Sequence, residues 1–150
     1  MLIKKYELKE ETVLEIGKFA ILWNLFEHDW CSNNCNPRRI REVANRISID
    51  SEKQAYLANV LNQRRSWFQQ LEADYVRDSL HPGNARKSSE EDMEIMSQFM
   101  QQTGVDLTCG CLLVLHRIRN NLMHGIKIAS ELDGQIELFQ AANAVLENLR

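Results

Sequence analysis

Residues that interrupt helices are scarce in this chain, which has only 6 glycines and 2 prolines among its 150 residues. A fold of many short strands needs turn residues at each connection, so this scarcity argues against such a fold and favours helices. A chain of this length can bury an adequate core as one domain, without disulfide bonds or a structural metal ion. We therefore expect a single all-α domain that spans residues 1–150.

Long apolar runs are also absent. No window of the sequence reaches the roughly 18 consecutive apolar residues that a membrane-spanning helix needs. The first residues, MLIKKYELKEE, become charged at once and lack the apolar core of a signal peptide. We expect a cytoplasmic protein with no membrane partner, in which the 4 cysteines are reduced thiols.

The spacing of these cysteines gives little support to a metal site. Cys31 and Cys35 form a CxxxC pair and Cys109 and Cys111 form a CxC pair, whereas zinc sites commonly use paired CxxC motifs. With His28 nearby, a zinc site could be drawn, but free thiols are the better interpretation. We expect neither a metal ion nor another cofactor.

The chain also lacks the strong positive charge of a protein that binds nucleic acid through its whole surface, since its net charge is -3 and its pI is about 5.8. A local basic patch can still act within an acidic protein. Between residues 105 and 130 the only acidic residue is Asp106, and this segment contains Arg117, Arg119 and Lys127.

Hydrophobic periodicity predicts an antiparallel four-helix bundle with one or two additional short helices. The first helix has the widest apolar face and is expected to be central. A capping box of Ser51 with Gln54 is expected to begin the third helix, and the loop at about 80–89 is expected to be flexible. The expected helices are Glu10–Trp30, Pro37–Ile47, Ser51–Ser79, a helix that Ser88 or Ser89 caps and that ends near Gln102, Asp106–His124, and Gly134–Leu149.

Two charged residues fall inside the apolar stripes of these helices. Glu27 belongs to the stripe of the first helix and Arg119 to that of the helix at 106–124. Because a buried ion is costly unless it is paired, we expect Glu27 to approach Arg119 within hydrogen-bonding distance. The pair could be purely structural, or Arg119 could serve as a cation for phosphate. His124 lies about 140° around the helix from Arg119, on the polar face, and His116 is interpreted as a surface residue.

Residues 119–125, RNNLMHG, resemble the signature of HEPN domains, in which a histidine follows an arginine after four to six residues. Arg119, Asn120 and His124 match this motif, and a glycine such as Gly125 follows the histidine in many members. HEPN domains are all-α bundles of about this size with the motif on a late helix. The resemblance implies a metal-independent endoribonuclease that works as a homodimer, in which the arginine and histidine of two protomers form one composite site.

The resemblance also implies roles for individual residues in a transesterification on RNA, with the 2′-OH as the nucleophile. His124 would transfer a proton, and Arg119 would stabilise negative charge on the phosphate. Asn120 would hydrogen-bond the imidazole or a phosphate oxygen. Supporting or RNA-binding positions are expected at Glu27, Asn121, Arg117 and Lys127.

RNA is therefore the expected substrate of a toxin, defence or stress ribonuclease, with an antitoxin or a nucleotidyltransferase as a possible protein partner. The alternative is a non-catalytic HEPN module that binds a nucleotide, RNA or a protein without cleaving it. The intact arginine–histidine pair favours the enzyme, and the absence of a strongly basic surface favours the binding module. A structural subunit of a helical bundle would require the motif to be accidental.

Overall fold

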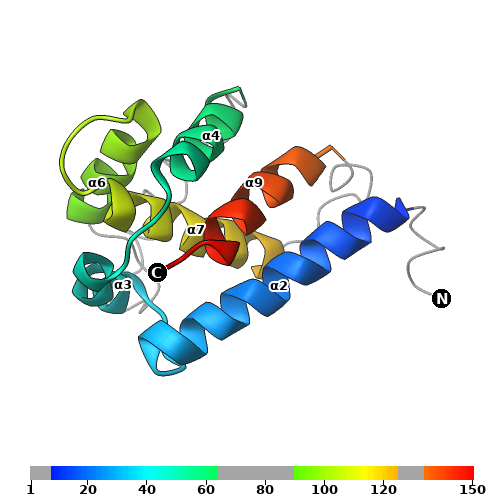
Figure 1. Ribbon diagram of the computed structural model, residues 1–150, viewed down its shortest axis with the longest axis horizontal. Helices are drawn as coiled ribbons and strands as arrows, with labels where there is room; N and C mark the ends of the chain where they lie inside the picture. The colour runs from blue at the N-terminus through cyan, green and yellow to red at the C-terminus, as the bar shows by residue number, and fades with distance from the viewer. Residues whose placement is uncertain (1–7, 64–89, 125–133) are drawn as a thin grey trace.

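The computed structural model describes residues 8–63, 90–124 and 134–150, with side chains described up to residue 120 of the second range. Within these ranges the chain is helical and contains no strand (Figure 1). The expected all-α bundle is confirmed. The helices are α2 (Glu10–Cys31), α3 (Pro37–Val43), the short 3-10 helix η1 (Ala44–Arg46), α4 (Ser51–Asn62), α6 (Glu90–Gln101), α7 (Leu107–His124) and α9 (Ile136–Glu147).

The long helix α2 covers one side of the bundle rather than forming its centre. Glu27, expected in its apolar stripe, lies at the partly exposed edge of the buried face. Leu14, Ile21 and Leu25 are exposed, so the expectation of a central first helix is wrong. The buried residues of α2 are Thr12, Phe19, Trp23, Phe26 and Cys31.

The central helix is α7, which passes through the middle of the molecule (Figure 1). Every residue from Cys109 to Ile118 is buried, because α6, α3 and η1 pack against this helix. At Gly110 the two helices α6 and α7 approach closely: a Cβ there would lie 2.6 Å from the Cβ of Phe99 and 2.7 Å from the carbonyl oxygen of Ile95. A helix covered on so many sides also buries its polar residues.

Two short helices begin at asparagine or aspartate caps. The Asn36 side chain accepts a hydrogen bond from the backbone N–H of Arg39 at 2.9 Å, and Pro37 occupies the first turn of α3 as expected. The cap of α4 is Asp50, which accepts from the N–H groups of residues 52 and 53. The expected capping box is therefore wrong: Ser51 is already helical, and the Gln54 side chain is buried.

The last helix, α9, packs against both α2 and α4. Asn143 of α9 donates to the backbone oxygen of Glu15 at 3.0 Å and to its carboxylate at 2.9 Å, which fixes α9 against α2. The chain end is tied back to the α3–α4 connection, because Ser48 and Arg150 exchange two backbone hydrogen bonds of 2.7 and 3.1 Å. The bundle thus joins the beginning and the end of the chain around α7.

Several expectations lie outside the described residues. These are the second half of the helix expected at Ser51–Ser79, the loop at about 80–89, the expected cap of the next helix at Ser88 or Ser89, and Gly125 at the end of the motif. The single-domain organisation of residues 1–150 stays a prediction.

Candidate functional site

A polar pocket of about 280 Å³ lies where α2, the α2–α3 turn and α7 meet. Polar side chains dominate its wall, and two of them begin the sequence motif on α7. The lining residues are Glu27, Asn33, Asn34, Cys35, Asn36, His116, Arg119 and Asn120.

The α2–α3 turn forms one wall because the chain reverses sharply after Cys31. Ser32 and Asn33 have left-handed backbone angles, with φ of 52° and 64°. Asparagine tolerates this conformation better than most residues with a side chain. The N–H of Asn33 donates to the carbonyl oxygen of Glu27 at 2.9 Å, and the N–H of Asn34 donates to that of Cys31 at 3.0 Å. These bonds close the end of α2 and bring three asparagine side chains to the pocket.

The opposite wall comes from one face of α7. His116, Arg119 and Asn120 are three and four residues apart, so their side chains lie on the same side of the helix. His116 is only 6% exposed and its ring lies against the Trp23 indole, with ring centroids 6.0 Å apart. The expectation that His116 is a surface residue is therefore wrong, because α2 covers this face of α7.

Arg119 lies at the border of the core rather than within it. Its side chain is half-buried, and Nη1 donates to Oδ1 of the buried Asn120 at 3.2 Å. The two motif residues thus contact each other inside the pocket wall. An arginine in this position keeps donors that can bind the oxygens of an anion.

Glu27 shares the pocket with Arg119 but does not pair with it. Its carboxylate accepts a hydrogen bond of 2.7 Å from the indole N–H of Trp23, one turn earlier on α2. Although both Glu27 and Arg119 belong to the described residues, no ion pair joins them, so the expected direct contact is wrong. Glu27 instead pairs with a residue one turn earlier on its own helix, at the partly exposed edge of the buried face.

Most of the other expected site residues have side chains outside the described part of the chain. His124 is the last residue of α7, and its side chain and that of Asn121 lie outside the described part, as does all of Lys127. Arg117 belongs to the described part of α7 and is 5% exposed. Their functional roles stay predictions.

Sequence reasoning missed five lining residues: Asn33, Asn34, Cys35, Asn36 and His116. A signal for His116 was present, because it precedes Arg119 by three residues and must share its helix face. No comparable signal identified the asparagines, since nothing local shows that the turn after α2 folds against α7.

The described residues contain no cluster of three or more His, Cys, Asp or Glu side chains that could hold a metal ion. In the same part of the chain, no helix combines the length and the apolar character needed to cross a membrane. Comparison of the chain with protein-family models, curated proteins and solved structures found no match.

Proposed function

We propose that this protein is a metal-independent endoribonuclease of the HEPN type, which cleaves RNA as a homodimer. The observation that carries the proposal is that Arg119 and Asn120, the first two residues of the motif, line a polar pocket. A motif that had arisen by accident on a structural helix would have no reason to open onto such a pocket.

Arg119 suits the phosphate of an RNA backbone. Its planar guanidinium offers two parallel donors to two oxygens, and its hydrogen bond to Asn120 restrains the orientation of the group. As the phosphate becomes more negatively charged in the transition state, a fixed cation stabilises it. Asn120 adds an amide donor beside the same phosphate.

The proposed reaction is a transesterification. The 2′-oxygen of a ribose attacks the adjacent phosphorus, the bond from phosphorus to the 5′-oxygen breaks, and a cyclic phosphate and a 5′-hydroxyl remain. One proton leaves the 2′-OH and one reaches the 5′-oxygen. His124 serves one of these transfers, because an imidazole titrates near neutral pH.

The proposed dimer rests on helical spacing. Positions 119 and 124 lie five residues apart, which corresponds to about 140° around an ideal helix, so side chains at these positions would not be expected to face one phosphate on a single chain. A two-fold partner would present its own histidine to Arg119 and receive the reciprocal contact. Toxin, defence or stress systems are the expected setting, in which an antitoxin or a nucleotidyltransferase would restrain the enzyme.

The test is to incubate the purified protein with mixed RNA in a metal chelator. We expect cleavage products with cyclic phosphate ends and no cleavage of DNA of the same sequences, because DNA lacks the nucleophile. Replacing His124 by alanine should lower the rate by at least about 100-fold. His28→Ala is the matched control, since it removes an exposed histidine of α2. Arg119→Lys keeps the charge but loses the planar fork and should also lose most activity.

A binding module without catalysis is the second candidate, and the position of Glu27 favours it. A carboxylate in the pocket repels a phosphate and weakens the case for an RNA backbone there. Such a module would bind a nucleotide, RNA or a protein but leave RNA intact. Retention of labelled RNA with no cleavage in chelator, by wild type and His124→Ala alike, would select this alternative.

A further inference from the structure

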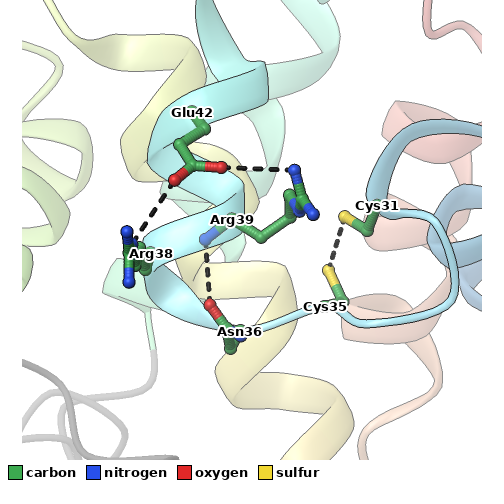
Figure 2. Close-up of polar contacts among 6 residues, drawn as sticks. All are labelled: Cys31, Cys35, Asn36, Arg38, Arg39 and Glu42. Carbon is green, nitrogen blue, oxygen red and sulfur yellow. Dashed lines mark hydrogen bonds and ion pairs between the residues drawn. The ribbon is translucent and has the colours of Figure 1, made fainter.

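The sulfur atoms of Cys31 and Cys35 lie 2.9 Å apart, and both residues are free thiols (Figure 2). We propose that this pair is a redox modification site, which a peroxide converts reversibly into an intramolecular disulfide. The bond would join the last residue of α2 to the turn that forms one wall of the pocket. This proposal does not depend on the RNA-cleavage activity.

The fold holds the two sulfurs together before any oxidation. Three residues separate the cysteines along the chain, and the left-handed angles at Ser32 and Asn33 turn the backbone back on itself. Asn36, directly after Cys35, is fixed as the cap of α3. Formation of a disulfide at about 2.05 Å therefore needs the sulfurs to move only about 0.9 Å closer, with no rearrangement of helices.

The surroundings of the pair favour one ionised and one protonated thiol, because the hydrogen bond between them lowers the pKa of Cys31 and raises that of Cys35. The hydrogen bond from Cys35 lowers the pKa of the Cys31 thiol, and the positive charge of Arg39 lowers it further, against the opposing effects of burial and Glu27. Figure 2 shows the Arg39 side chain extending from α3 toward the two sulfurs. Because only the thiolate reacts, a pair that shares one proton beside a cation is more reactive than an isolated buried thiol.

The two cysteines differ in access. Cys31 is 0% exposed, whereas Cys35 is half-buried and lines the pocket. The hydrogen bond and burial raise the pKa of Cys35, so Cys31 is the preferred site of the negative charge. Since either sulfur can donate the hydrogen bond between them, the shared proton can also pass to Cys31 and leave a minor population of thiolate on the accessible Cys35. Cys35 is therefore the sulfur that meets a peroxide, and Cys31 is the resolving thiol.

The reaction balances with one molecule of peroxide. The Cys35 thiolate attacks a peroxide oxygen, an S–O bond forms, the O–O bond breaks, and the leaving hydroxide takes up a proton to become water. The Cys31 sulfur then attacks the sulfenic acid, the S–S bond forms and the S–O bond breaks. The Cys31 proton leaves with the hydroxide as a second water, and two electrons have passed from the sulfurs to the peroxide.

The other two cysteines serve as an internal control. Cys109 and Cys111 are buried, and burial raises the pKa of Cys109 to about 11 and also raises that of Cys111. Positions two apart on a helix point in different directions, so these thiols cannot bridge each other without unfolding α7.

The experiment treats the folded wild-type protein with a small excess of hydrogen peroxide, alkylates it in denaturant and digests it with trypsin. Cys31 and Cys35 fall in the same tryptic peptide, residues 19–38, and Cys109 and Cys111 fall in another. We expect the first peptide to lose about 2 Da and both alkyl groups, and a dithiol reductant to restore the alkylation. The second peptide should keep two alkyl groups throughout.

Full alkylation of Cys31 and Cys35 after peroxide treatment would overturn the proposal. So would a disulfide between two chains, or equally fast oxidation of Cys109 and Cys111. Cys31→Ser tests the order of events without relying on the wild-type result, provided that circular dichroism shows a folded helical protein. In that variant Cys35 should form a sulfenic acid that a dimedone-type reagent captures, whereas an unreactive Cys35 would contradict the assignment.

Discussion

Gly110 offers a sharp test of the packing that holds the motif helix in place. Replacing this glycine by alanine adds a Cβ that would lie 2.6 Å from the Cβ of Phe99 and 2.7 Å from the carbonyl oxygen of Ile95. Neither atom can move aside by a side-chain rotation, so α6 and α7 must separate. Overpacking of this kind typically costs about 1–3 kcal/mol. The higher helix propensity of alanine returns about 1 kcal/mol, so we expect a net loss of up to about 2 kcal/mol in the free energy of unfolding.

Gly17→Ala is the matched control, because it is the same substitution within a helix but without steric cost. Gly17 is exposed in the middle of α2, and a Cβ there meets nothing within 4 Å. This variant should gain about 0.5–1 kcal/mol from helix propensity and reduced freedom of the unfolded chain. Urea unfolding followed by circular dichroism should therefore separate the two variants, and their melting temperatures should differ by up to roughly 12 °C. A Gly110→Ala protein as stable as Gly17→Ala would refute the close approach of α6 and α7.

Three further predictions concern charge and assembly. Arg41→Met should destabilise the fold by about 3 kcal/mol in urea unfolding, because it removes the cation that pairs with the 1%-exposed carboxylate of Asp92. Arg38→Met, on the exposed face of the same helix, is the control and should change stability by less than about 0.5 kcal/mol. Equal effects of the two variants would show that the buried pair contributes nothing. Arg39→Gln removes a cation that lowers the pKa of the Cys31 thiol, so the rise of the peroxide reaction rate with pH should move to higher pH, with Arg38→Gln as the unshifted control. If two protomers form the RNA-cleaving site, activity per chain should fall on dilution, with the same midpoint as dimer dissociation measured by sedimentation. Activity per chain that stays constant below this midpoint would exclude a composite site.

The sequence predicted the helices of this protein better than the faces that they bury. The ends of α2 and α7 agree closely with the expected ranges, because hydrophobic spacing and local breakers act within the helix itself. The buried face of α2 differs from the expected stripe, since Phe19 and Phe26 are buried and Glu27 lies at the edge; on a helix with so wide an apolar face, spacing alone does not decide which side is covered. The cap at Asp50 instead of Ser51 reflects a similar competition between two neighbouring residues of nearly equal capping strength.

The candidate site was predictable only where it depends on one helix. The motif pointed to Arg119 and Asn120, and both line the pocket. The contribution of the α2–α3 turn depends on how the chain reverses after Cys31 and on which helix it then meets, which periodicity does not encode. Burial of His116 and Arg117 has the same origin, because their exposure is decided by α2, α3 and α6 rather than by their own helix.

The position of His116 bears on how one site can use an arginine and a histidine of the same helix. A histidine precedes Arg119 in the sequence and another follows it, and the two differ in their position around the helix relative to Arg119. His116 lies three residues before it, on the same helix face and in the same pocket, whereas His124 lies five residues after it and about 140° away. An imidazole within the chain could therefore hold a bound anion beside Arg119 in a monomer, while the partner's histidine would be needed to move a proton. If the two histidines have these separate roles, His116→Gln should weaken phosphate binding with the cleavage rate at saturation largely retained. His124→Ala should instead lower the cleavage rate at saturation with phosphate binding largely retained. A loss of saturated rate in His116→Gln as large as in His124→Ala would place the proton transfer within one chain, and the composite site would not be required.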